Sequence, residues 1–167
     1  MTGPEPSVPR PSATADPDDL NAAETTALRI LGGASQSATG LERRLLQRGF
    51  SRRSASAAVE RCRALGYIND AALATSVVGR HRRAGHGRAR MLADLRTRGI
   101  GTDAARDAVT AVAEDEQQSA IDAARHLLER ETRRGDLDEK GRRRIASALQ
   151  RRGFAGDVVV RALRAIT

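Results

Sequence analysis

The sequence predicts an all-α protein made of three tandem three-helix repeats, which form an elongated, curved, solenoid-like body behind a disordered N-terminal tail. Three observations predict this class. Aromatic residues make up only 2% of the 167 residues, whereas β-sandwiches and barrels depend on aromatic and β-branched side chains. No proline follows Pro17, and one glycine-centred phrase recurs at Gly49, Gly99 and Gly153.

Residues 1–17 form the predicted tail. All five prolines of the chain lie there, together with Ser, Thr and Gly and almost no large apolar residue. Such a composition cannot bury enough apolar surface to offset the entropy of folding. We therefore expect this segment to be disordered, and its removal to leave the stability of the body almost unchanged.

The recurring phrase predicts a helix that ends at glycine, followed by a second helix. Apolar residues stand four and eight positions before each glycine, and another follows it directly. This spacing marks one face of a helix, and the glycine fits the C′ position, where the backbone turns left-handed. Apolar residues ten and thirteen positions later return in helical phase. The predicted core positions are Leu41, Leu45, Phe50, Val59 and Cys62, then Met91, Leu95, Ile100, Val109 and Val112, then Ile145, Leu149, Phe154, Leu163 and Ile166.

One more helix precedes this pair in each copy. In the second copy it begins near Asn69 and Asp70, a favourable N-cap pair, and ends at Gly85. Its apolar face holds Leu73, Ala74, Val77 and Val78. The predicted repeats are 18–67, 68–115 and 116–167. Because none of them could bury much core alone, we expect neighbours to stack.

Several function classes are disfavoured. One cysteine excludes an internal disulfide framework, and the chain has neither an apolar stretch long enough to span a membrane nor a signal-like N-terminus. We therefore expect a cytoplasmic protein with no membrane contact. No catalytic constellation, metal site or cofactor site is predicted, because His81, His86 and His126 lack clustered ligands and Cys62 falls on a core face. By helical phase, His81 is expected to pack at the edge of the core.

Charge is the strongest functional signal. The chain carries 29 Lys+Arg against 21 Asp+Glu, a net charge of +8, and every cation except Lys140 is arginine. The cations gather in residues 42–63, 80–98 and 142–152, whereas 114–139 is acidic. Separate basic and acidic zones create a directional field. Arginine clusters bind phosphates or acidic protein surfaces, and the scarcity of aromatics argues against base stacking.

The arginines differ in how well a structural role explains them. Arg48, Arg98 and Arg152 end helices, where a cation complements the helix dipole. Those around the Gly85–Gly87 turn point away from the apolar face, and the sequence places no acid close to them. The predicted binding residues are Arg80, Arg82, Arg83, Arg88 and Arg90, with Arg43 and Arg44 in the first repeat and Arg142 and Arg143 in the third.

Residues 66–100 contain a characteristic set of positions: Gly66, Tyr67, Ile68, Asn69, Asp70, Leu73, Ala74, Gly85, Gly87, Leu95, Gly99 and Ile100. At these positions the stretch resembles the RecX family of bacterial recombination regulators. Leu73 and Val77 stand where the family has aromatics, and His81 where it has arginine. The flanking glycine phrases extend the resemblance over residues 25–167, and the family is also built from three-helix repeats.

The resemblance implies a non-enzymatic protein that binds the RecA filament on single-stranded DNA and inhibits or disassembles it. We expect this protein to be a monomer. Recombination, DNA repair and the SOS response would then be modulated, and DNA contacts would be electrostatic and independent of sequence. One alternative is a DNA-binding protein without RecA contact, either sequence-independent or of helix-turn-helix type. Another is an adaptor that binds only protein. A helix-turn-helix protein needs a single reading head, so the threefold repetition favours the first hypothesis.

Overall fold

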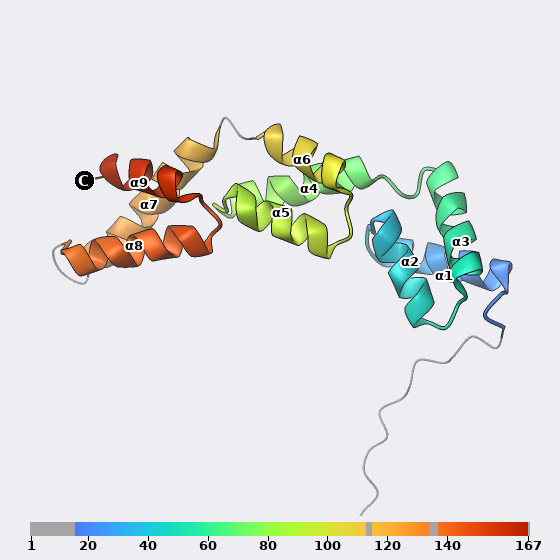
Figure 1. Ribbon diagram of the computed structural model, residues 1–167. Coiled ribbons are helices and arrows are strands. Elements are labelled where there is room, and N and C mark those ends of the chain that lie inside the picture. Colours follow the sequence, from blue (N-terminus) through green and yellow to red (C-terminus); the bar gives the residue numbers. More distant parts are fainter. Residues whose placement is uncertain (1–15, 113–114, 134–136, 167) are drawn as a thin grey trace, which may run out of the picture. The chain divides into compact units, whose positions relative to one another are not determined.

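The protein is described by a computed structural model that covers residues 16–112, 115–133 and 137–166. Over these ranges the chain folds into α-helices joined by turns and short loops, and the helices pack in three groups of three (Figure 1). The predicted all-α class and three-helix repeats are confirmed. The bounds are α1 (Leu20–Gly33), α2 (Ala38–Gln47), α3 (Arg52–Ala64), α4 (Asp70–Arg83), α5 (Arg88–Thr97), α6 (Thr102–Thr110), α7 (Glu116–Thr132), α8 (Glu139–Arg151) and α9 (Gly156–Arg164).

The repeated glycines close the middle helix of each group, as predicted. Gly49, Gly99 and Gly153 have φ of 93°, 75° and 89°, in the left-handed region that favours glycine. In each turn the amide after the glycine donates to the carbonyl five residues earlier, for example from Ile100 to Leu95 at 3.0 Å. This pattern is the Schellman motif. The residue that follows the glycine is thereby directed into the core, and Phe50, Ile100 and Phe154 are all buried.

Each group encloses its own apolar core. The middle helices contribute their paired residues, such as Leu95, Ile145 and Leu149, which are at most 1% exposed. The last helices contribute Val59, Cys62 and Val109, whereas Val112, Leu163 and Ile166 are only half-buried. In α4, Ala74, Val77 and Val78 are buried and Leu73 packs at the edge of the core. Within the described residues, no helix is long and apolar enough to cross a membrane.

The chain divides into two compact units between Asn69 and Asp70. The first unit holds α1–α3 and the second holds α4–α9. The elongated, curved arrangement of all three groups stays a prediction.

The N-terminal boundary corrects one expectation. Residues 1–15 of the predicted tail lie outside the described residues, but Asp16 and Pro17 do not. The Pro17 carbonyl accepts hydrogen bonds from the Ser51 amide at 2.8 Å and from the Ser54 hydroxyl at 2.6 Å. Ser51 also donates to the Asp18 carboxylate. Pro17 is therefore attached to the start of α3, so the predicted tail, which ended at residue 17, included a residue that belongs to the folded body.

Within the second unit, two glycine turns bring repeats two and three into backbone contact; we call this contact the glycine joint. The Gly87 amide donates to the Arg152 carbonyl at 2.8 Å, and the Ala89 amide to the Gly153 carbonyl at 3.2 Å. A Cβ atom on Gly87 would lie 2.4 Å from the Gly153 carbonyl oxygen. The joint therefore requires a residue without a side chain at position 87. The Gly85–Gly87 turn separates two helices and also contacts the turn of repeat three.

Candidate anion-binding surface

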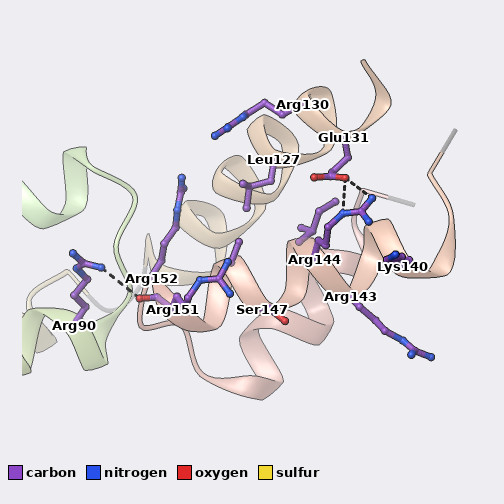
Figure 2. Close-up of a pocket in the computed structure, with 12 residues that line it drawn as sticks. Arg90, Leu127, Arg130, Glu131, Lys140, Arg143, Arg144, Ser147, Arg151 and Arg152 are labelled. Carbon is purple, nitrogen blue, oxygen red and sulfur yellow. Dashed lines mark hydrogen bonds and ion pairs between the residues drawn. The ribbon is translucent and has the colours of Figure 1, made fainter. Parts of the chain in front are cut away.

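A concavity of about 650 Å³ opens between α5, α7 and α8 of the second unit (Figure 2). Its walls carry seven cationic side chains and one carboxylate, that of Glu131. We call it the basic concavity. The cations are Arg90 from α5, Arg130 from α7, Lys140, Arg143, Arg144 and Arg151 from α8, and Arg152 from the turn that follows α8.

Helix α8 supplies most of this surface because its cations recur with helical spacing. Lys140, Arg144 and Arg151 fall on one face together with Ser147, which also lines the basic concavity. The core residue Leu149 is fully buried, and Ile145 is 1% exposed at the floor. Packing of the apolar face therefore fixes the direction in which the cationic face points.

The single carboxylate of the basic concavity is already used. Glu131 accepts from Arg144 through the same Oε2 atom, at 2.9 Å from Nε and 2.7 Å from Nη2 (Figure 2). The Glu131 side chain is 13% exposed. Its hydrogen bond raises the pKa of Arg144. The pair thus holds α7 against α8. Of the other cations of the wall, Arg143 is paired with Glu139 at 3.2 Å, on the same helix.

The remaining cations have few partners among the described residues. Arg130, Lys140, Arg151 and Arg152 form no ion pair with any carboxylate of the described chain. Arg90 reaches from repeat two, and its Nη1 donates to the Arg151 carbonyl at 3.5 Å. Several unpaired guanidinium groups around one concavity suit an anion with several oxygens.

The structure corrects the expectation that no acids lie near the arginines of the Gly85–Gly87 turn. Arg82 is 3.0 Å from the Asp115 carboxylate. The Arg88 side chain is 4.0 Å from Glu116, whose other oxygen accepts from the Arg88 amide at 3.0 Å. The start of α7 therefore supplies two acids, and both pairs link repeat two to repeat three.

The predicted arginines do not form one site. Arg90 and Arg143 line the basic concavity. Arg82 and Arg83 line a separate depression of about 330 Å³ that also carries Asp115 and Asp122, so it is less suited to an anion. Arg142 lines a shallow groove between α8 and α9. Arg80 is exposed on α4, and Arg43 and Arg44 are exposed on α2 of the first unit.

Sequence analysis did not select Arg130, Lys140, Arg151 or Arg152 for this surface. Arg152 does end its helix, as predicted, but its side chain also lines the basic concavity. The three- and four-residue spacing of the basic and polar residues from 140 to 151 was the signal that could have found the wall of α8. No local pattern could have placed Arg90 or Arg130 opposite it.

Neither enzymatic nor metal chemistry has a visible site in the described residues. Cys62 is 1% exposed, and burial together with Glu24 raises the pKa of its thiol. No group of three or more His, Cys, Asp or Glu side chains there could hold a metal ion. His81 is half-buried, as its helical phase predicted, but the structure gives it a carboxylate partner, Asp94, which sequence spacing did not reveal.

Comparison with known proteins gives a consistent result. The family model of the RecX third three-helix domain matches residues 114–163. A regulatory protein RecX of Xanthomonas campestris is 34% identical over 138 residues, which cover 83% of each chain. One from Mycobacterium avium is 31% identical over 147 residues, covering 87% of this chain and 84% of the relative.

A solved structure shows a similar fold. The crystal structure of RecX from Lactobacillus salivarius superimposes with a TM-score of 0.78 and 20% identity. The match covers 89% of this chain and 96% of the other. At this identity the likeness concerns the arrangement of the helices.

Proposed function

Because the chain belongs to the RecX family of regulatory proteins, we propose that it acts as a monomer on the RecA filament in the cytoplasm and contacts the DNA of that filament through the basic concavity. RecX regulators are non-enzymatic, and they modulate recombination and the SOS response by inhibiting RecA. The proposal adds a surface and a ligand to this role: the phosphates of single-stranded DNA.

The charge of the basic concavity is the observation that carries the proposal. Seven cations and one carboxylate line the concavity. Arg144 is paired with that carboxylate and Arg143 with Glu139, so five cations have no carboxylate partner among the described residues. Phosphate oxygens accept paired hydrogen bonds from guanidinium groups, and a strand offers one phosphate after another. The chain has few aromatic residues, and none lines the concavity. Binding should therefore depend on the backbone of the strand and not on its bases.

An acidic surface of RecA is the competing partner for the same cations. Salt distinguishes the two, because each lost phosphate contact lowers the slope of log affinity against log salt by about 0.7 for a single strand. A protein partner would leave the slope for free DNA unchanged. The helix-turn-helix alternative predicts a preference for particular base pairs, which a surface of this kind does not provide.

The test removes two cations of the basic concavity, in the variant R130Q/R151Q. Both side chains are exposed, so folding should survive. The variant R96Q/R106Q is a matched control, because it removes two exposed helical arginines of the same unit outside the concavity. The readouts are the single-stranded-DNA-dependent ATPase rate of RecA and the affinity for oligo(dT) over a range of salt concentrations.

We expect the wild-type protein and the control to lower the ATPase rate equally. R130Q/R151Q should need at least about tenfold more protein, since hydrogen bonds to charged groups contribute about 1.5–3 kcal/mol each, and its salt slope should fall by about 1.4. Weaker inhibition with an unchanged slope would move the contact from DNA to RecA. Equal behaviour of both variants would refute the role of the basic concavity.

A further inference from the structure

Beside the basic concavity, three titratable side chains form a continuous hydrogen-bonded chain. His81 on α4 lies with its Nε2 2.9 Å from the Asp94 carboxylate on α5. Its Nδ1 lies 2.8 Å from the Nδ1 of His86 in the turn between the two helices. Asp94 also accepts from Arg98 at 3.0 Å. The order is therefore Arg98, Asp94, His81, His86.

The carboxylate end of the chain fixes the tautomers. Burial favours the neutral acid, but hydrogen bonds from His81 and Arg98 outweigh it and hold the pKa of Asp94 below its ordinary value. Asp94 is then ionised near neutral pH and can only accept, so the Nε2 of His81 carries hydrogen. In the neutral pair the Nδ1 of His81 accepts, and the Nδ1 of His86 donates to it.

This geometry accepts one additional proton and no more. If the Nε2 of His86 takes up a proton, the Nδ1 of His86 keeps its hydrogen and still donates it to the Nδ1 of His81. The contact of 2.8 Å survives because one hydrogen still lies between the rings. Two charged rings would place two N–H groups against each other, so the contact would break.

His86 connects this pair to the basic concavity. The Nη1 atom of Arg152 is 3.6 Å from the position that a Cβ atom on Gly85 would occupy, so the guanidinium lies against the turn that carries His86. Burial lowers the pKa of His86, and the charges of Arg90, His81 and Arg152 lower it further. Arg90 and Arg152 are both lining residues of the concavity.

We propose that the basic concavity binds phosphate together with a proton, which His86 takes up. The inference rests on the proposed phosphate contact. A phosphate held by Arg90 and Arg152 offsets the two charges that disfavour a proton on His86. By linkage, the same proton then strengthens phosphate binding, so affinity rises as the pH falls through the range in which His86 titrates.

The surrounding charges favour this direction. From α5 the pair faces Arg90 and Asp94, with Arg98 beyond the carboxylate, and from the turn after α8 it faces Arg152. Asp94 keeps the hydrogen of His81 on Nε2, so the Nδ1 of His81 remains an acceptor for His86. Arg82 and Arg88 are paired with Asp115 and Glu116. The cations that a bound phosphate would neutralise are thus the ones that face His86.

The experiment measures binding of oligo(dT) to the full chain, with thymine chosen because its base does not titrate in this range. Fluorescence anisotropy at about pH 5.5 and about pH 7.5 gives the affinity change, and calorimetry in two buffers of different ionisation enthalpy gives the protons taken up. The variants are H86Q and, as a control, H126Q, since His126 is an exposed histidine elsewhere in the unit.

We expect the wild-type protein and H126Q to bind at least about threefold more tightly at the lower pH, since one unit of pKa change corresponds to a factor of ten, with a fraction of a proton taken up. H86Q should bind with almost no pH dependence and no uptake. Binding to wild type without proton uptake would overturn this inference alone. No binding at either pH would overturn both it and the proposed phosphate contact. The wild-type calorimetry decides the question even if H86Q does not fold.

Discussion

Replacing Gly87 by alanine tests the glycine joint with one methyl group. The added Cβ atom would lie 2.4 Å from the Gly153 carbonyl oxygen, and 2.5 Å from both the Gly153 carbonyl carbon and the Phe154 amide nitrogen. All three are backbone atoms, so no side chain can move aside. The φ of Gly87 is −82°, which any residue adopts. The cost is therefore steric and not conformational.

The expected loss follows from what must separate. Forcing a methyl group into a packed site typically costs about 1–3 kcal/mol. The two backbone hydrogen bonds of the joint contribute about 1 kcal/mol each if they break. The clash is relieved either by strain around the methyl group or by loss of the two hydrogen bonds, so the two costs do not add. We therefore expect Gly87→Ala to lower the free energy of unfolding by about 2 kcal/mol, within the range for overpacking.

Gly101→Ala is the matched control. Gly101 is also a helix N-cap without a side-chain hydrogen bond, its φ is −59°, and nothing lies within 4 Å of a Cβ atom there. Both substitutions share the small cost of alanine at an N-cap. The difference between their urea midpoints, followed by circular dichroism, therefore isolates the joint. Equal midpoints would refute the contact. A transition that splits in two for Gly87→Ala alone would show that the joint couples repeats two and three.

Three further predictions concern other parts of the chain. Ser54→Ala should lower the free energy of unfolding by about 1–2 kcal/mol, because the fully buried hydroxyl loses its hydrogen bond to the Pro17 carbonyl. Removal of residues 1–17 should lower the stability measured by thermal unfolding by a similar amount, whereas removal of residues 1–15 should not. Leu149→Ala should lower the free energy of unfolding by about 2–5 kcal/mol, as is typical for a fully buried leucine. Leu163→Ala should lower it clearly less, because Leu163 is half-buried. Equal losses in urea unfolding would contradict the assigned core. The pKa of His86 in the folded state lies below the ordinary value of 6.5, so the unfolded chain takes up the proton first as the pH falls. The free energy of unfolding should therefore decrease as the pH drops from 6.5 towards the folded-state pKa. Urea unfolding at a series of pH values should show a weaker dependence of this free energy on pH in H86Q.

The features that depend on short-range interactions, namely the glycine turns and the buried helix faces, could be predicted from the sequence. A glycine after an apolar pair at helical spacing predicts a left-handed turn, and Gly49, Gly99 and Gly153 all form one. The same phase placed Leu95 and Leu149 in their cores, where they are fully buried. These features depend on a few consecutive residues, so the repeat could be recognised three times.

The candidate surface depends on residues that are distant in sequence. Arg90 meets Arg151 only because the turn of repeat three docks on the start of α5. Asp115 and Glu116 neutralise arginines about thirty residues earlier for the same reason, and His81 reaches Asp94 across two helices. Charge counting over consecutive residues therefore overestimated the free charge near Arg82 and Arg88 and missed the concavity formed with Arg130 and Lys140.

The glycine joint also has a consequence for the divergence of related sequences. A Cβ atom on Gly87 would meet the backbone at Gly153, and one on Gly153 would lie 2.5 Å from the Arg90 amide nitrogen. Neither position can gain a side chain unless the opposite turn moves away. Relatives that keep this contact should therefore carry glycine at both positions, and those that lose one glycine should change the other turn as well. The residues at positions 87 and 153, which lie in different repeats, would then change together or not at all.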